Sequence, residues 1–191
     1  MRRTGKLADR AKPIACCVRQ ALAGNAQLVT GAVGKVNDIT DHALHARSAD
    51  VGAGTAGLAS AALAAVLEAC RVGRLTRSQH VLLRLGELVA WTECAGSVAR
   101  RAAAAADGTL PEKSDRRFTA PALAAISRVF ARDAALKVAD DGLRLVRGAG
   151  DGSTDLTSFE AQLRLDDVHA AQTRLLEDMD LVADAVYART A

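Results

Sequence analysis

Apolar residues recur every three or four positions along most of the chain after residue 57, which is the spacing of one face of an α-helix. The longest such stripe runs to about residue 106, and its apolar positions are Leu82, Leu85, Leu88, Thr92, Ala95 and Ala99. Similar stripes span residues 58–72, 121–146 and 157–187. Helices of this length with short connections bury their stripes in an antiparallel bundle. The pattern therefore predicts an all-α bundle of four to five helices.

Two segments predict where helices begin. Thr76 and Gln79 form a capping box, in which the Thr76 hydroxyl accepts a hydrogen bond from the Gln79 backbone N–H. Residues 157–160 form a second capping box, which is expected to open one continuous last helix.

Glycines between residues 48 and 57 predict a linker. We therefore expect an N-terminal helical segment and linker over residues 1–54, and the bundle over residues 55–191. The sequence at 52–57, GAGTAG, also matches the G-x-G-x-x-G motif of nucleotide sites, but that motif needs a preceding strand. No strand pattern precedes it, so a linker is the preferred interpretation.

The composition supports helices and few other structures. The chain has 191 residues, half of them apolar, and its 42 alanines contrast with only five aromatic residues. Alanine and leucine are strong helix formers, whereas all-β proteins are rich in aromatic and β-branched residues. Composition thus favours an all-α chain and leaves the chemistry open.

Charge is distributed unevenly along the chain. Residues 1–150 have a net charge of +9, and residues 151–191 have a net charge of −6. A nucleic-acid-binding protein usually concentrates basic charge without such an offset. We expect no nucleic-acid partner, and we expect two oppositely charged faces that attract each other within the fold or between copies in a homo-oligomer.

The cysteines and the N-terminus indicate a cytoplasmic chain. None of Cys16, Cys17, Cys70 and Cys94 lies in a C-x-x-C pair, and all four are expected to be buried thiols in helices. Charged residues follow Met1 where a secretory signal would be apolar. The longest uncharged apolar stretch, residues 51–67, is short for a membrane span.

Four residues near the N-terminus are candidate metal ligands. Asp38, Asp41, His42 and His45 form the pattern D-x-x-D-H-x-x-H, which places a carboxylate and an imidazole one helical turn apart twice. A second set from a facing helix is needed to complete a site in a bundle. We favour a solvated helix face and keep a small metal-binding bundle as an alternative.

Two other features carry candidate chemistry. Arg116 and Arg117 precede Phe118 in a loop, and this group is a candidate contact for an anionic surface such as a membrane. An ordinary solvated loop is the favoured interpretation. Glu93 lies beside Trp91, the only tryptophan, but its position on the helix predicts that it faces solvent.

Three segments together resemble a known helical domain. They are residues 77–91 (RSQHVLLRLGELVAW), 97–102 (SVARRA) and 126–135 (ISRVFARDAA), followed by DDGL at 140–143. Their order resembles that of the C-terminal helical accessory domain of acyl-CoA dehydrogenases of the very-long-chain type. The resemblance covers about ninety residues of the chain.

The resemblance implies a role in fatty-acid β-oxidation without a catalytic site in this chain. In that family the FAD-binding portion and the catalytic glutamate precede the accessory domain. We therefore expect a non-catalytic domain that assembles with an acyl-CoA dehydrogenase flavoprotein portion or subunit, which holds the FAD. An independent helical interaction module is the alternative. The candidate interface is the stripe Leu175, Met179, Val182 and Val186.

The purified chain is accordingly expected to have no acyl-CoA dehydrogenase activity of its own. Incubation with a long-chain acyl-CoA and an electron acceptor should give no turnover above the blank. The absorption spectrum of the pure chain should lack flavin bands, and a bound flavin would contradict this expectation.

Overall fold

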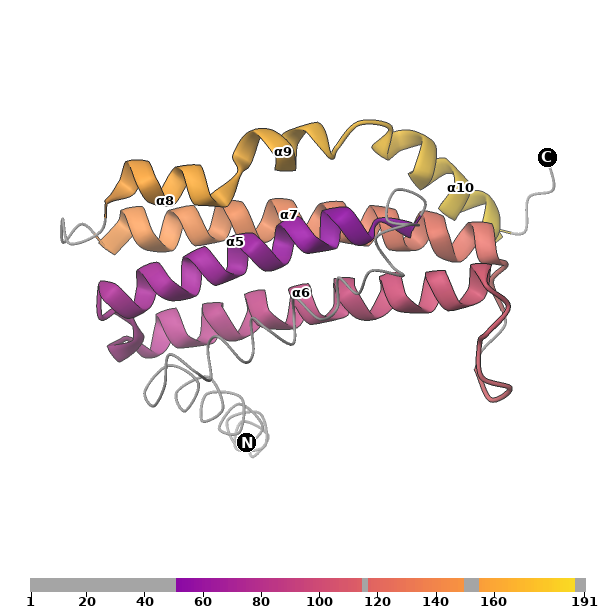
Figure 1. Cartoon of the computed structure of the whole chain (residues 1–191), viewed down its shortest axis with the longest axis horizontal. Coiled ribbons are helices and arrows are strands. Elements are labelled where there is room, and N and C mark those ends of the chain that lie inside the picture. The colour runs from indigo at the N-terminus through magenta and orange to yellow at the C-terminus, as the bar shows by residue number, and fades with distance from the viewer. Residues whose placement is uncertain (1–50, 115–116, 150–154, 188–191) are drawn as a thin grey trace, which may run out of the picture.

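The computed structural model describes residues 51–114, 117–149 and 155–187, and within these ranges all regular secondary structure is helical. In chain order the elements are α5 (Ala53–Val72), the short 3₁₀ helix η1 (Leu75–Arg77), α6 (Gln79–Ala106), α7 (Ala120–Ala149), α8 (Leu156–Leu163), α9 (Leu165–Ala170) and α10 (Leu175–Tyr187). Helix α6 runs antiparallel to both α5 and α7, which therefore run parallel to each other, and α8, α9 and α10 follow in series along α7 and α5 (Figure 1). The predicted all-α bundle is confirmed.

Helix α7 lies at the centre of this arrangement, because α5, α6 and α10 all pack against it. The face that α6 turns inward is the predicted one: Leu82, Leu85, Leu88, Thr92, Ala95 and Ala99 are all buried. The buried Thr92 hydroxyl donates to the backbone oxygen of Leu88, so the polar group on this face is satisfied.

The buried face of α7 only partly follows the stripe that the spacing predicts, which includes Leu123, Leu136, Val138, Leu143 and Val146. Leu123, Val138 and Val146 are buried as predicted. Leu136 is exposed and Leu143 is half-buried, whereas most of the buried positions are small. The buried alanines of α7 are Ala122, Ala125, Ala131, Ala134, Ala135 and Ala139. A methyl side chain lets helix backbones approach closely, so a helix surrounded by several others buries its alanines and leaves larger residues at the periphery.

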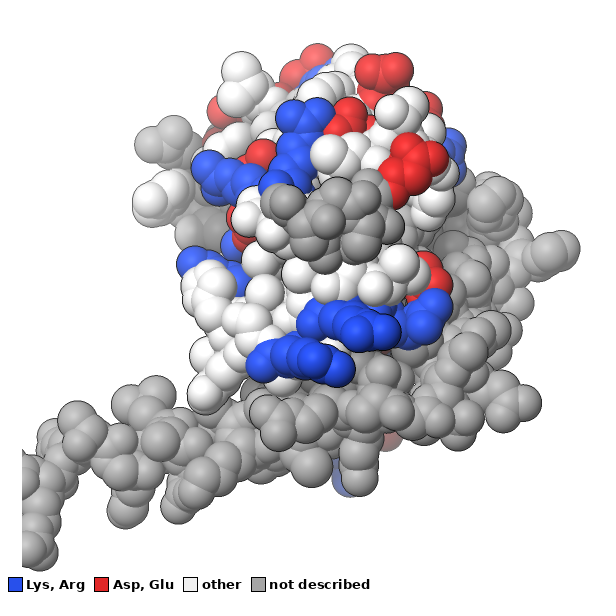
Figure 2. Space-filling model, turned by 90° about the vertical axis from the view of Figure 1, so that its left-hand side faces the viewer, with Lys and Arg blue, Asp and Glu red and all other residues white. Residues whose placement is uncertain are grey.

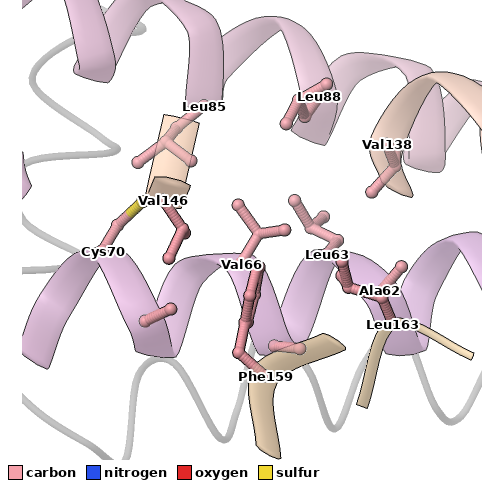
Figure 3. Packing of buried hydrophobic residues seen from close by; sticks show 12 residues of the cluster. Ala62, Leu63, Val66, Cys70, Leu85, Leu88, Val138, Val146, Phe159 and Leu163 are labelled. Atoms are coloured by element: carbon pink, nitrogen blue, oxygen red, sulfur yellow. The ribbon is translucent and has the colours of Figure 1, made fainter. Parts of the chain in front are cut away.

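The largest apolar cluster forms where α5 meets α6, α7 and α8 (Figure 3). Val66 and Leu63 of α5 lie at its centre, Leu85 and Leu88 come from α6, and Phe159 comes from α8. Burying a side chain of this size contributes about 1.5–3 kcal/mol. Helix α8 is therefore held to the bundle mainly by its apolar face.

The expected linker is wrong at its C-terminal end, because α5 begins at Ala53 rather than at Leu58. The buried Ser127 hydroxyl donates to the Val51 carbonyl at 2.6 Å, which fixes this segment against α7. Gly52 has φ 72°, and a Cβ there would lie 2.9 Å from the Arg128 Cα. A glycine is thus required by backbone conformation and by close packing, which explains part of the glycine-rich motif without a nucleotide.

Neither capping box forms as predicted. Helix α6 begins after Ser78, which makes no side-chain capping bond, and Thr76 belongs to η1. Helix α8 is capped by Asp155, whose carboxylate accepts from the backbone N–H groups of Thr157 and Ser158. Aspartate is as good an N-cap as threonine or serine, and it occurs earlier in the chain.

The predicted continuous last helix is divided into three. Arg164 has φ 53° and Arg174 has φ 64°, and these left-handed residues separate α8 from α9 and begin α10. The breaks let the three short helices stay packed along α5 and α7. One straight helix of the same length would diverge from α5 and α7.

Helix α5 is the one described helix that is long and apolar enough to cross a membrane by length and composition. Of its most apolar window, 56% is buried inside the bundle. Its apolar surface is thus used in packing against α6, α7 and α8.

The closest approach of α5 and α7 predicts a sharp steric effect. A Cβ at Gly142 would lie 2.1 Å from Cγ2 of the fully buried Val66. We expect Gly142→Ala to lower the free energy of unfolding by about 1–3 kcal/mol, because an extra methyl forces the helices apart. Denaturant unfolding followed by circular dichroism measures this change.

Gly148→Ala is the matched control, because no atom lies within 4 Å of a Cβ built there in the same helix. It should be neutral or stabilising by up to about 1 kcal/mol. The double variant Val66→Ala, Gly142→Ala should lose less stability than the sum of the two single variants, because the smaller residue 66 makes room for the new methyl group. Equal stability of Gly142→Ala and Gly148→Ala would contradict the close contact.

Candidate functional site

A buried cluster of charges joins α10 to α7. Asp178 is the buried residue of α10, and its carboxylate pairs with Arg128 and Arg132, which lie one turn apart on α7. Both Asp178 oxygens accept from Arg128 Nε at 3.0 Å, and Oδ2 also accepts from Arg132 Nη1 at 2.5 Å. The side chain of Asp178 is 8% exposed. A charge so well shielded from water needs such partners.

Arg132 also fixes the turn between α9 and α10. Its Nε donates to the Ala171 carbonyl at 2.7 Å, and its Nη2 donates to the Thr173 carbonyl at 3.0 Å. In return, Gln172 Nε2 donates to the Arg132 carbonyl at 3.4 Å. One guanidinium thereby holds both the turn and the helix that follows.

The cluster favours the ionised form of Asp178. Hydrogen bonds from Arg128 hold the pKa of this carboxyl below its usual value, burial opposes them, and hydrogen bonds from Arg132 lower it further. The two guanidinium groups supply a fixed positive environment at neutral pH. The cluster therefore stabilises the docked position of α10 as long as Asp178 stays charged.

The outer face of α10 carries an apolar stripe. Leu176 is 73% exposed, Met179 47%, Val186 57% and Tyr187 72%. Their spacing, with half-buried Ala183 between them, places them on one side of the helix. We call these residues the α10 stripe. Of the predicted interface residues, Met179 and Val186 belong to it, whereas Leu175 and Val182 are half-buried on the side facing the bundle.

A groove of about 580 Å³ opens on another side of α7, between α6 and α9. Its apolar lining comes from Trp91 of α6, Leu136 and Leu143 of α7, and Leu165 of α9. The indole of Trp91 stacks on Phe130 with ring centroids 5.1 Å apart. We call this feature the Trp91 groove.

The polar lining of the Trp91 groove is predominantly acidic. It consists of Asp133, Asp140, Asp141, Lys137 and His169. Lys137 Nζ lies 2.9 Å from Asp141 Oδ2, 3.0 Å from Glu87 Oε1 and 5.8 Å from the centroid of the Trp91 ring. These two carboxylates raise the pKa of Lys137, and the hydrogen bond that Lys137 donates to Asp141 is the larger cause. The lysine charge is thus already compensated.

Charged side chains are distributed unevenly over the bundle. Basic side chains gather at the end where α5, η1 and α6 meet (Figure 2). Arg71, Arg74 and Arg77 are exposed there. Helix α10, with acidic Asp180 and Glu177 exposed, lies toward the other end (Figure 1). The acidic C-terminal part, residues 155–187, runs along the length of the bundle from α8 to α10, so the charge difference along the sequence does not become a difference between the two ends (Figure 1).

Several predicted site residues lie outside the described ranges. Asp38, Asp41, His42 and His45 all belong to residues 1–50, and Arg116 also lies outside. Within the described residues, no group of three or more His, Cys, Asp or Glu side chains is arranged to hold a metal ion.

The basic loop and Glu93 have defined places. Arg117 is exposed, but Phe118 packs against the apolar cluster around Leu123, so its ring is not free to enter a membrane. Glu93 is exposed, as predicted.

The cysteine prediction is confirmed for one residue and wrong for another. Cys70 is buried, and burial raises the pKa of its thiol to about 11, so the unreactive thiol form persists at neutral pH. Cys94 is exposed on α6. Cys16 and Cys17 lie outside the described residues.

Comparisons with known proteins identify no family: no family model, curated protein or solved structure matches the chain.

The buried charge cluster predicts a large effect of neutralising one carboxylate. Asp178→Asn leaves Arg128 and Arg132 without their shared counter-charge, so we expect a loss of about 3–5 kcal/mol in the stability of the docked α10. Amide hydrogen exchange of α10 measures the local opening, and denaturant unfolding measures the global change. Asp180→Asn, an exposed substitution on the same helix, should change stability by no more than about 0.5 kcal/mol.

The sign of the pH dependence follows from the lowered pKa of folded Asp178. The contribution of Asp178 is present above its unfolded-state pKa of about 3.9 and is lost as pH falls through the lower folded-state pKa. Below about pH 4 the parent should therefore lose stability more steeply than Asp178→Asn. Parallel stability curves for the two proteins would contradict the role of this pair.

Proposed function

We propose that this chain is a non-catalytic helical module that assembles with a partner protein through the α10 stripe. The observation that carries the proposal is a row of large exposed apolar residues on a helix that buried charges fix in position. Single exposed apolar residues are common, whereas contiguous apolar patches often mark protein interfaces. A fixed helix also loses little conformational freedom when a partner binds.

The charges beside the α10 stripe define the chemistry of the partner surface. Glu177, Asp180 and Asp184 lie on the same side of α10 as Leu176, around the edge of the stripe. Glu177 is paired with the exposed Arg174. A complementary partner therefore presents an apolar groove with lysine or arginine side chains at its rim. Such charges affect the rate and orientation of association more than its affinity.

The sequence resemblance suggests which protein this partner is. We propose that the module assembles with an acyl-CoA dehydrogenase flavoprotein of the very-long-chain type and stabilises it. In this proposal the flavoprotein holds the FAD and the catalytic base of fatty-acid β-oxidation. The contribution of this chain is a rigid helical surface.

Self-association is a second candidate, favoured by the exposed acidic residues of α10 and the exposed basic residues around η1. The acidic surface of α10 in one copy can contact the basic cluster around Arg74 and Arg77 of another. Such a contact weakens with salt, because at 0.1 M salt charges are screened beyond about 10 Å.

Co-purification with a candidate flavoprotein tests the proposed assembly. The tagged chain, co-expressed with an acyl-CoA dehydrogenase from the same source, should retain a yellow partner with flavin absorbance. Replacing Leu176 and Met179 together by glutamine should weaken binding at least about tenfold, because it removes apolar area that the interface buries. Glutamine keeps the helix propensity of α10.

Leu83→Gln is the matched control, since Leu83 is 49% exposed on α6, away from the α10 stripe. It should bind as the parent does. Equal loss for Leu83→Gln and for the α10 double variant would contradict the assigned surface. If no flavoprotein is retained and the chain sediments as an oligomer that dissociates at high salt, self-association is favoured instead.

A further inference from the structure

We propose that the Trp91 groove binds an organic cation with an apolar body, such as an aryl-alkyl ammonium ion. This inference is independent of the α10 stripe and of the proposed partner. It rests on the size of the groove, on its apolar lining, and on the sign of the charge around it.

The dimensions of the groove suit a small molecule. Its volume of about 580 Å³ lies within the range of about 300–1,000 Å³ that is typical of ligand pockets. Along α7 it extends from Asp133 to Leu143, which corresponds to about 15 Å of helix. The lining is mainly apolar with a few polar groups, the usual composition of a site that binds an amphipathic ligand.

The charges around the groove favour a cation. Three carboxylates and one ammonium line it, and the ammonium of Lys137 is bound by Asp141 and Glu87. The carboxylate of Asp133 has no hydrogen-bond or ion-pair partner among the described residues, and Asp140 has only the exposed Arg144 at 3.5 Å. These two carboxylates are therefore available to a bound cation.

The indole ring contributes an apolar surface to the groove, and Lys137 already occupies its cation–π position. Lys137 Nζ already lies 5.8 Å from the centroid of Trp91, which is within the range of a cation–π interaction. Stacking on Phe130 fixes the ring in place. A ligand can place its charge near Asp133 or Asp140 and its apolar body on Trp91 and Leu136. It then contacts both the acidic and the apolar parts of the lining.

The test uses phenylpropyl-trimethylammonium as the probe, with phenylpropanol and phenylbutyrate as neutral and anionic controls. Trp91 is the only tryptophan of the chain, so its fluorescence reports this groove alone. Free tryptophan amide corrects for collisional quenching. We expect saturable binding of the cation, weaker binding of the alcohol, no binding of the anion, and a loss of cation affinity as salt rises.

Charge variants at one exposed position give the sharpest result. Leu136 is 40% exposed in the groove, so a charged side chain at this position can reach solvent. Leu136→Glu and Leu136→Arg are both compatible with a helix, and both remove the same apolar side chain. Leu136→Glu should bind the cation more tightly than Leu136→Arg by roughly tenfold, because the exposed glutamate attracts the cation and the exposed arginine repels it. Melting temperatures show whether both variants fold.

Neutral variants complete the test. Asp133→Asn and Asp140→Asn should each weaken cation binding roughly twofold to fivefold, whereas Asp180→Asn on α10 should leave it unchanged. Equal affinities of Leu136→Glu and Leu136→Arg, or equal binding of the cation and the alcohol, would overturn the proposal. Binding of a lysine-rich amphipathic peptide alone, with none of the small cation, would also overturn it.

Discussion

The salt bridge between Asp178 and the two arginines of α7 determines where α10 and the turn before it lie. Removing a carboxylate and two guanidinium groups from water costs several kcal/mol per ion, and only close pairing and additional hydrogen bonds offset this cost. The structure provides both, since Arg132 also donates to two carbonyls of the turn before α10. That turn contains Arg174 in a left-handed conformation, which a non-glycine residue adopts at a cost of roughly 1–2 kcal/mol. The buried arginine thus stabilises a backbone conformation that the local sequence disfavours.

The bundle itself follows from information that is local in the sequence. The apolar spacing of α6 identifies its buried face correctly, because the side chains on that face are large and the helix has one side toward the core. The prediction is only partly right for α7, which has neighbours on several sides. Leu123, Val138 and Val146 are buried as predicted, but alanines occupy most of the other buried positions. The start of α5 was missed for a related reason. Gly52 and Val51 are ordered by contacts with Arg128 and Ser127, which are more than seventy residues away in the sequence.

The α10 stripe was only partly predictable, because the identity of its buried face depends on a charged residue. The predicted interface groups Leu175, Met179, Val182 and Val186 on one face of the helix. The helix instead turns Asp178 inward, so the inner line passes through Leu175, Asp178 and Val182, and Met179 and Val186 face outward. An acidic residue at core spacing, together with two arginines four residues apart on another helix, is the signal that identifies this arrangement. The Trp91 groove leaves no such signal, because three separate helices supply its lining.

The two candidate surfaces depend on the same guanidinium group. Arg132 holds Asp178 and thereby sets which residues of α10 face outward. Its bond to the Ala171 carbonyl fixes the chain immediately after α9, and α9 supplies Leu165 and His169 to one wall of the Trp91 groove. Asp133, the next residue on α7, is part of that groove and points about 100° away around the helix. A buried ion pair is weak evidence for stability in general. Here the ion pair fixes α10 and the turn after α9 in one position on α7. Because that position is fixed, both the α10 stripe and the Trp91 groove have a defined shape.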